Sequence, residues 1–134
     1  MEITYATTAD IEVITELDVH ISKKELTKAM NEKRIIVLKD NDKLCGWLRY
    51  NLFWDSIPFL NMIYVLYEYR NQKIGKSLLL FWEKKMKSKA YDFVLTSSLS
   101  TEEAQHFYRK LGYRDCGNLI LPNQASETFF IKTL

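Results

Sequence analysis

The chain is poor in cysteine, with only Cys45 and Cys116 among its 134 residues. Neither cysteine belongs to a group of residues spaced like the ligands of a metal site. Free thiols are the rule in the reducing cytoplasm, where disulfides are rare. We therefore expect two free thiols in a cytoplasmic protein, with no metal among its cofactors.

Long apolar runs and a strong net charge are absent as well. No apolar run approaches the roughly 18 residues that a membrane span requires, and residues 1–5 lack the basic and apolar regions of a signal peptide. The formal net charge is only +2, which is too small to indicate nucleic-acid binding by the whole chain. We expect neither a membrane nor a nucleic acid among its partners. We expect the protein to be a monomer or a homodimer.

What is present is an ordinary globular composition. Hydrophobic residues make up 47% of the chain and charged residues 27%, which is enough to build one core. The length lies within the usual size of one domain. No linker and no internal repeat interrupts the sequence, so we expect a single domain over residues 1–134.

Apolar periodicity and capping residues predict the element order β-α-α-β-β-β-α-β-α-β-β. A run of antiparallel hairpins followed by two β-α steps predicts an α/β (α+β) fold, with a mixed sheet flanked by helices on both faces. The crossover around residues 74–89 should join parallel strands in the right-handed sense. The expected strands cover residues 3–5, 34–39, 44–54, 59–66, 93–96, 113–121 and 127–131.

Polar residues mark where the expected helices begin and end. Thr8 is the expected cap of the first helix. Residues 74–86 form a further helix, and Gly112 ends the last one. Two capping boxes are expected, Ser22 with Glu25 and Ser100 with Glu103.

The most informative segment is the turn formed by residues 69–79, with the sequence YRNQKIGKSLL. It is a basic, glycine-containing turn between a strand-like run and an amphipathic helix-like run. The first backbone N–H groups of a helix have no partners within it, and the helix dipole places positive charge there. Arg70, Lys73 and Lys76 add formal charge around these amides. The turn therefore predicts a site for a phosphate or a pyrophosphate.

Two segments of the chain resemble known sequence motifs. They are Arg70-x-x-Lys73-x-Gly75 and residues 103–113 (EAQHFYRKLGY). The first resembles the Arg/Gln-x-x-Gly-x-Gly/Ala signature of the GNAT superfamily of acetyl-CoA-dependent N-acetyltransferases. The second resembles that superfamily's Ala-x-x-Phe-Tyr-x-Lys-x-Gly-Phe segment. Their order and separation, and the element order, also match, so the resemblance covers nearly the whole chain. It implies a GNAT-like fold and acetyl-CoA as the co-substrate.

Two positions depart from the GNAT pattern. Lys73 occupies the first glycine of the signature, and we expect ordinary helical dihedrals there, because a lysine with positive φ would be strained. Thr101 stands where many relatives place an asparagine near the pantetheine arm of the cofactor. Its alternative role is to support the helix start beside Ser100.

The resemblance implies how acetyl-CoA binds. In this superfamily the acetyl-CoA arm lies along the splayed end of the central strand like an additional strand, and the pyrophosphate sits on the backbone amides of the turn. Because these are main-chain contacts, the side chains there can vary. The cofactor-binding residues carried over in this way are Met62, Ile63, Tyr64, Val65, Arg70, Asn71, Gln72, Lys73, Ile74, Gly75, Lys76, Ser77 and Thr101.

Acetyl transfer to an amine also needs a proton donor and a proton acceptor. Tyr108 matches the tyrosine that protonates the departing CoA sulfur in many relatives, and a phenol with a pKa of about 10 stays protonated at neutral pH. Packing beside Phe107 is the alternative role of Tyr108. Glu68, just past the central strand, is the leading candidate for the base, and its alternative role is pairing with Arg70. The other candidates for the base are Asp55, His20 and His106.

The hairpin between residues 44 and 66 is rich in aromatic side chains. Alternation along a strand separates them between two faces, so some belong to the core and others are free to line a groove for the acceptor. Such a groove would suit an amine with an apolar or cationic body. The aromatic residues are Trp47, Tyr50, Phe53, Trp54 and Phe59.

The sequence thus predicts an N-acetyltransferase that moves the acetyl group of acetyl-CoA to a primary amine by direct transfer in a ternary complex, with a small metabolite as the preferred acceptor. The alternatives are a protein acetyltransferase acting on lysine or an N-terminus, and a non-catalytic acyl-CoA-binding regulatory module. The lysines at positions 84, 85, 87 and 89 form a basic run. We expect it to be a solvated helix face, because no nucleic-acid-binding motif accompanies it.

Overall fold

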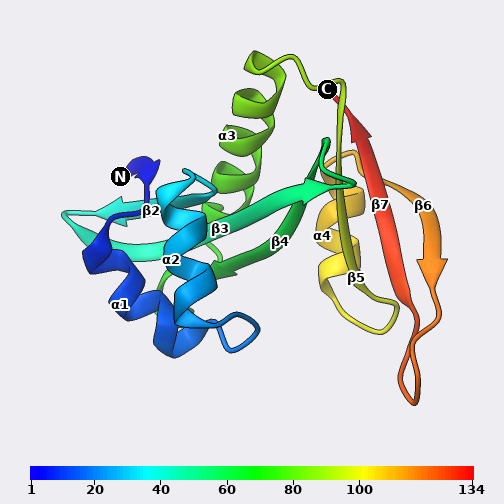
Figure 1. The fold of residues 1–134 in the computed structure, drawn as a ribbon, viewed down its shortest axis with the longest axis horizontal. Helices are drawn as coiled ribbons and strands as arrows, with labels where there is room; N and C mark the ends of the chain where they lie inside the picture. Colours follow the sequence, from blue (N-terminus) through cyan, green and yellow to red (C-terminus); the bar gives the residue numbers. More distant parts are fainter. The chain divides into compact units, whose positions relative to one another are not determined.

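Polar side chains determine where the two N-terminal helices begin in the computed structural model, which describes residues 1–134 (Figure 1). α1 follows Thr7, whose backbone N–H donates to the Asp10 carboxylate at 2.8 Å. The predicted cap at Thr8 is wrong by one residue, because the carboxylate three residues along selects Thr7. α2 follows Ser22, whose Oγ accepts from the Glu25 N–H at 3.2 Å, as predicted. The helices are α1 (Thr8–Leu17), α2 (Lys23–Asn31), α3 (Ile74–Ser88) and α4 (Ala104–Lys110), with a short 3-10 helix η1 (Tyr67–Tyr69) before α3.

The strands form a seven-stranded mixed sheet in the order β1-β2-β3-β4-β5-β7-β6. Apart from η1, the elements follow one another as predicted, and the expected α/β (α+β) class is confirmed. β4 and β5 are the parallel neighbours that the crossover was expected to join, with Leu60 opposite Thr96. None of the helices is both long and apolar enough to span a membrane. The strands are β1 (Glu2–Tyr5), β2 (Ile35–Asp40), β3 (Lys43–Phe53), β4 (Ile57–Val65), β5 (Phe93–Leu99), β6 (Arg114–Leu119) and β7 (Glu127–Thr133).

Two compact units make up the chain. The first contains Met1–Asn51 and Met62–Trp82, and the second contains Leu52–Asn61 and Glu83–Leu134. β3, β4 and α3 therefore each contribute residues to both units.

The first unit buries apolar side chains on one face of its strands against α1 and α2. Val37 lies opposite Trp47 in the antiparallel pair of β2 and β3, so both side chains project to this face. They form one buried cluster with Ile14 of α1 and Leu26 of α2. Figure 1 shows α2 crossing in front of β3 on this side. The 3.6-residue period of the helices and the two-residue period of the strands meet in this cluster.

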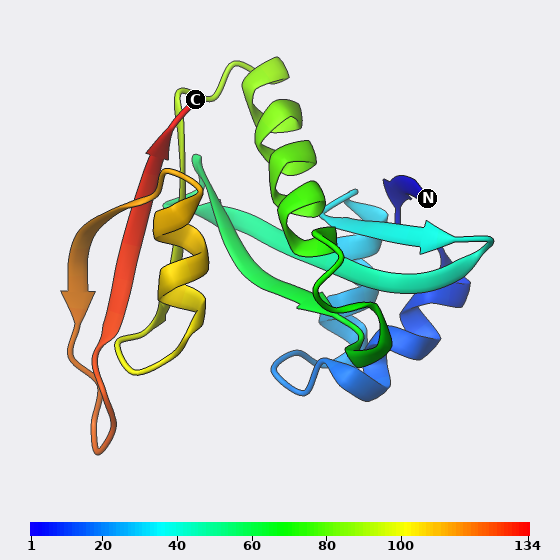
Figure 2. The same cartoon turned by 180° about the vertical axis from the view of Figure 1, so that it is seen from behind.

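The opposite face of the same strands is covered by the beginning of α3, as seen from behind in Figure 2. Gly46 of β3 makes the close approach possible. A side-chain carbon on Gly46 would lie 2.7 Å from the Tyr64 carbonyl oxygen and 3.3 Å from Cγ2 of Ile74. No other residue than glycine fits there without displacing α3 or β4. The first unit thus has helices on both faces, as predicted.

The second unit is built on the antiparallel strands β5, β7 and β6, with α4 beside them (Figure 1). Its core is aromatic. The fully buried ring of Phe130 on β7 lies 5.8 Å from the ring of Tyr108 on α4, and the ring of Tyr113 lies 5.6 Å from Tyr108. Such tilted ring pairs add specific contacts to the burial of apolar area.

The start of α4 differs from the prediction, because Ser100 and Glu103 do not form a capping box. The carboxylate of Glu102 instead accepts from the Leu99 N–H at 2.8 Å, and the Ser100 carbonyl accepts from the Gln105 side chain at 3.0 Å. β5 extends to Leu99, and Glu102 is the acidic residue three positions after it, the spacing at which a side chain reaches back to a backbone N–H. The carboxylate that binds is therefore Glu102.

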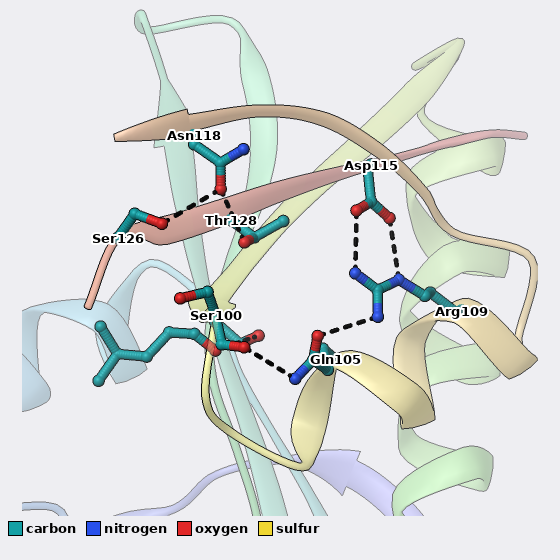
Figure 3. A network of polar contacts seen from close by, with 9 residues as sticks. Ser100, Gln105, Arg109, Asp115, Asn118, Ser126 and Thr128 are labelled. Atoms are coloured by element: carbon teal, nitrogen blue, oxygen red, sulfur yellow. Dashed lines mark hydrogen bonds and ion pairs between the residues drawn. The ribbon is translucent and has the colours of Figure 1, made fainter. Parts of the chain in front are cut away.

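A polar network connects α4 to β6 (Figure 3). The Arg109 guanidinium forms two parallel hydrogen bonds of 2.9 Å with the Asp115 carboxylate and donates to Gln105 at 2.9 Å. The guanidinium bonds lower the pKa of Asp115 from its ordinary value. Between these elements Gly112 has a φ of +92°, which glycine adopts without the steric clash of a Cβ. Gly112 thus ends α4, as predicted.

Candidate active site

The predicted anion site is the turn between β4 and α3, and it belongs to the first unit. Its path differs from the direct strand-to-helix turn that the sequence predicted, because η1 intervenes before Arg70. Residues 70–73 are exposed, and α3 starts at the buried Ile74. The side chain of Ile74 anchors the helix while the residues before it face solvent.

The backbone amides of this turn are open to a ligand. No carbonyl or side chain of the protein accepts from the N–H groups of residues 71–76, whereas the Ser77 N–H donates to the Lys73 carbonyl at 3.0 Å. φ is positive at Asn71 and at Lys73 but not at Gln72 between them. Such alternation turns successive amides toward a common point and forms an anion-binding concavity. The dipole of α3 adds positive charge at the same place.

The expectation of ordinary helical dihedrals at Lys73 is wrong. Its φ of 62° places Lys73 in the left-handed region. The helix begins only at Ile74, so Lys73 is the residue that redirects the chain into α3. Glycine adopts this conformation freely, whereas a residue with a Cβ pays about 1–2 kcal/mol. The turn therefore keeps the geometry for which the signature places glycine, at the cost of strain in a lysine.

Arg70 is oriented by β4 and by two aromatic rings. Its Nε donates to the Val65 carbonyl at 2.9 Å, and its guanidinium lies 5.5 Å from the ring centre of Tyr64 and 5.8 Å from that of Tyr67. Cation–π contacts of this kind hold a guanidinium in place without neutralising it. Arg70 thus turns toward Val65 and the rings rather than toward Glu68.

The aromatic side chains of the hairpin are partly core and partly exposed, as expected, although the exposed Trp54 lies beyond the end of β3. Trp47 and Tyr50 are buried in the first unit, and Trp47 stacks on Tyr64 with the ring centres 4.7 Å apart. Trp54, in the second unit, is 78% exposed. Phe53 and Phe59 are half-buried there. The predicted cofactor-binding stretch of β4, residues 62–65, is also half-buried.

The predicted proton donor Tyr108 lies in the second unit and is only 5% exposed. Its ring contacts Phe107 at 5.5 Å, so the packing role also exists in the structure. Burial raises the pKa of the Tyr108 phenol to about 12, and a side-chain hydrogen bond with Thr96 acts in the opposite direction. Tyr108 is therefore protonated at neutral pH, as a proton donor must be.

Thr96 is a buried polar residue of the second unit that the sequence reasoning missed. It lies on β5, and its hydroxyl donates to the Leu60 carbonyl at 3.1 Å. The sequence signal was a threonine directly after the apolar residues Val94 and Leu95 in a strand expected to be buried. A buried hydroxyl needs a partner, so its position deserved a search for one.

The candidates for the general base lie on four different segments. Glu68 is exposed in η1, and His20 is exposed after α1, where its N–H donates to Asp18 at 3.3 Å. Asp55 lies in the turn between β3 and β4, and His106 on α4 is 3.9 Å from Glu103. Glu68 and His20 share the first unit with the turn, and Glu68 is the nearer of the two along the chain.

Thr101 is exposed in the loop between β5 and α4. The helix begins after Glu103, so Thr101 does not cap it. Like Tyr108, Thr101 belongs to the second unit, whereas every other predicted cofactor-binding residue belongs to the first.

A family model described as "Acetyltransferase (GNAT) domain" matches residues 31–115. The chain belongs to the GNAT acetyltransferase family. The predicted family and enzyme class are thereby confirmed, and the protein is an acetyl-CoA-dependent N-acetyltransferase. The matched residues include both predicted motifs. No curated protein sequence matches the chain.

Solved structures share the fold over nearly the full length. A GNAT family acetyltransferase from Bacillus cereus is 22% identical, with a TM-score of 0.81 over 98% of this chain and 96% of that one. An aminoglycoside 6′-N-acetyltransferase complexed with coenzyme A is 20% identical, with a TM-score of 0.83 over 99% and 97%. A ribosomal-protein-alanine N-acetyltransferase from Brucella melitensis is 16% identical, with a TM-score of 0.84 over 100% of both chains.

Proposed function

We propose that this GNAT acetyltransferase moves the acetyl group of acetyl-CoA to the primary amine of a small metabolite, by direct transfer in a ternary complex. The observation that carries the proposal is the set of unpartnered backbone amides at residues 71–76. Amides that converge at a helix start bind phosphate groups. Residues 1–134 would act as a single domain in the cytoplasm, where the free thiols Cys45 and Cys116 would stay reduced.

The pyrophosphate of acetyl-CoA would bind the amides of residues 71–76. The exposed cations Lys73 and Lys76 and the oriented guanidinium of Arg70 would add charge around it. The Lys73 carbonyl is satisfied within the protein, because it accepts from both the hydroxyl and the backbone N–H of Ser77 at 3.0 Å. The backbone of residues 62–65 would bind the pantetheine and the thioester carbonyl, and Thr101 would contact the pantetheine.

Tyr108 would protonate the sulfur of CoA as the tetrahedral intermediate collapses. Its raised pKa of about 12 keeps the phenol protonated at neutral pH, so the proton is present when negative charge develops on the sulfur. Burial serves this role because water does not compete for the proton in an apolar setting.

Glu68 would accept the proton that the amine loses, either directly or through water. An alkyl ammonium with a pKa of about 10.4 is mostly charged at neutral pH, so a proton acceptor helps to form the nucleophile. Two observations support Glu68. It is exposed, so its carboxylate can exchange protons with solvent, and Arg70 is engaged elsewhere and does not pair with it.

Structural relatives act on acceptors of two kinds, an aminoglycoside and the alanine of a ribosomal protein. Both are amines, which supports the reaction type. Chain length does not decide between a small acceptor and a protein acceptor, because the ribosomal-protein-alanine N-acetyltransferase aligns over 100% of both chains.

An acetylation screen tests the proposed function. The purified protein is incubated with acetyl-CoA and a panel of amino acids, polyamines, aminoglycosides and peptides, and the free CoA thiol is measured. We expect turnover with at least one small amine. Turnover with peptides alone would replace the small acceptor by a protein acceptor. Binding of CoA by calorimetry without turnover on any amine would show a regulatory module instead.

A further inference from the structure

A buried network of three polar side chains lies in the second unit. The carboxylate of Glu83 on α3 accepts from the hydroxyl of Tyr113 at 2.8 Å through Oε2, and from Nζ of Lys132 on β7 at 2.8 Å through Oε1. The ammonium of Lys132 also lies 5.6 Å from the centre of the Tyr113 ring. Both carboxylate oxygens have partners, and Lys132 balances the charge of Glu83. The network is therefore fully satisfied, and it holds the Tyr113 side chain in a defined place.

Tyr113 is joined to Tyr108 through its backbone as well as through its ring. The Tyr113 N–H donates to the Tyr108 carbonyl at 3.1 Å. The two ring centres are 5.6 Å apart, and the rings are tilted by 59°. Gly112 forms the turn between them, and the stem of Lys132 covers it, because a side-chain carbon on Gly112 would lie 3.5 Å from Cε of Lys132. The position of the Tyr108 side chain is therefore tied to that of Tyr113.

Tyr108 needs support from outside its own helix. α4 contains only seven residues and begins without a side-chain hydrogen bond at its N-cap. A helix of this length is unstable in water without tertiary contacts. The ion pair of Arg109 with Asp115 also holds α4, but its side chains are 39% and 52% exposed, so solvent screens it. The hydrogen bond between Tyr113 and Glu83 is buried, and it is therefore the restraint at the end of α4 that water does not weaken.

Three aromatic rings surround the ring of Tyr108. Those of Phe107, Tyr113 and Phe130 lie 5.5, 5.6 and 5.8 Å from it. The two phenylalanine side chains have no hydrogen-bonding group, so they contact Tyr108 through ring surface alone. Tyr113 is the neighbour whose ring is fixed by a directional bond to another element. Glu83 thereby restrains one side of the ring cluster in which Tyr108 lies.

We propose that Glu83 and Tyr113 are positioning residues for acetyl transfer, whose hydrogen bond holds Tyr108 in the orientation from which its phenol protonates the sulfur of CoA. The inference rests on the proposed role of Tyr108 as the proton donor. Both residues act through Tyr108 and not on the substrate. Orientation matters for such a group, because a misplacement of about 1 Å can cost about a hundredfold in rate.

The proton transfer itself leaves Glu83 and Tyr113 unchanged. The C–S bond of the tetrahedral intermediate breaks, and its electron pair goes to sulfur. The O–H bond of Tyr108 breaks as an S–H bond forms. The phenolate then regains a proton from solvent, which has received the proton that the amine nitrogen lost.

Two substitutions remove the hydrogen bond, and a third keeps it. Tyr113→Phe deletes the hydroxyl and keeps the ring, and Glu83→Met deletes the acceptor and keeps an unbranched side chain. Glu83→Gln retains an oxygen that accepts from Tyr113. We expect the first two to lower kcat about tenfold, less than the cost of a misplacement of about 1 Å. The KM for acetyl-CoA should change less than about twofold, and Glu83→Gln should retain kcat within about threefold.

Two controls separate the loss of position from the loss of stability. Ile14→Val removes a methyl group from the fully buried core of the first unit, so it destabilises the fold but should leave kcat within about twofold. In a Tyr108→Phe background, Tyr113→Phe should cause no further loss of kcat, because the hydroxyl that it positions is already absent. Circular dichroism and thermal melts check folding at the assay temperature, and Glu83→Met carries the test if Tyr113→Phe does not fold.

Two results would show a purely structural role and overturn the proposal. One is an equal loss of kcat from Tyr113→Phe with and without the Tyr108 phenol. The other is a loss in Glu83→Gln as large as that in Glu83→Met.

The remaining outcomes separate this inference from the proposed function. If Tyr108→Phe lowers kcat while Tyr113→Phe and Glu83→Met do not, the inference fails and the role of Tyr108 stands. If Tyr108→Phe leaves kcat unchanged, the assignment of the proton donor fails, and the roles of Glu83 and Tyr113 fail with it. Absence of turnover with every amine would overturn the proposed function and this inference together.

Discussion

The hydroxyl of Tyr113 donates a 2.8 Å hydrogen bond to Oε2 of Glu83. The other oxygen of this carboxylate accepts from Nζ of Lys132 at 2.8 Å. Glu83 is only 7% exposed and Tyr113 only 2%. Burial, and then the charge of Glu83, raise the pKa of the Tyr113 phenol above its ordinary value. The phenol therefore remains a donor, and both oxygens of a buried carboxylate are satisfied.

Removing this donor should destabilise the fold. Tyr113→Phe keeps the ring and leaves one oxygen of the buried Glu83 carboxylate unpaired, which should lower the free energy of unfolding by about 1–3 kcal/mol. Urea denaturation measures the change. Tyr67→Phe is the matched control, because Tyr67 is 82% exposed and its substitution should change the stability by less than about 0.5 kcal/mol. Equal urea midpoints in the parent and Tyr113→Phe would show that the bond contributes nothing.

Because Lys73 has a left-handed conformation, replacing it with glycine should stabilise the fold rather than destabilise it. Lys73→Gly should raise the free energy of unfolding by up to about 1 kcal/mol, because relief of about 1–2 kcal/mol of strain is partly offset by the greater freedom of glycine in the unfolded chain. Lys76→Gly removes the same charge inside α3, where glycine should cost about 1 kcal/mol. Destabilisation by both substitutions would contradict the conformation of Lys73.

Much of the fold could be predicted from local patterns. Apolar periodicity marked the strands and helices, and the box formed by Ser22 and Glu25 marked the start of α2. The start of α1 could also be read from a local pattern, because an acidic residue, Asp10, stands three positions after Thr7 but not after Thr8. The conformation of Lys73 depends on where α3 begins, and burial of Ile74 fixes that start.

Part of the candidate site could also be predicted from local sequence patterns, and part of it could not. The unpaired amides of the candidate turn could be predicted from the sequence, because a helix start leaves amides unpaired whatever its neighbours are. The packing of Tyr108 against Phe130 could not, because it joins a helix to a strand. No periodicity within either element reveals a partner on another element.

Gly75 tests the location of the pyrophosphate. Gly75→Val adds a branched side chain to the second residue of α3 and should obstruct the approach of phosphate to the backbone. We expect CoA binding to weaken at least about tenfold in calorimetry, the equivalent of one lost charge-assisted hydrogen bond. Lys84→Val, at an exposed position later in α3, is the control for a valine in this helix. A folded Gly75→Val protein that binds CoA normally would show that the site lies elsewhere.

The buried phenols predict a loss of stability at high pH. The pKa of Tyr108 is raised to about 12 in the folded state, against about 10 in an unfolded chain. Its contribution is therefore fully present below about pH 10 and is lost as the pH rises toward 12, at up to about 1.4 kcal/mol per pH unit. Tyr113 acts in the same direction.

Urea unfolding from about pH 9 to about pH 11 measures this loss, and Tyr108→Phe should make the decline shallower. Tyr67→Phe is again the control, because an exposed phenol has no comparable burial. Identical slopes in the parent and Tyr108→Phe would show that the Tyr108 phenol is not held protonated by the fold.

The two thiols allow a test of direct transfer. A covalent acetyl-enzyme would require a cysteine thiolate. Cys45 is fully buried, and burial raises its pKa; burial and the nearby Asp115 also raise the pKa of the exposed Cys116. Both groups are therefore held as poorly nucleophilic thiols.

We expect Cys45→Ala and Cys116→Ser to retain kcat/KM within about threefold in folded protein, because neither thiol takes part in the chemistry. Initial rates measured while both substrates vary should give intersecting double-reciprocal lines, since acetyl-CoA and the amine must be bound together. Parallel lines in the parent, with loss of activity in one cysteine variant that is still folded, would replace direct transfer by an acetyl-cysteine intermediate. The exposed Cys116 would then be the first residue to examine by mass spectrometry for a bound acetyl group, because acetyl-CoA can reach it without opening the core.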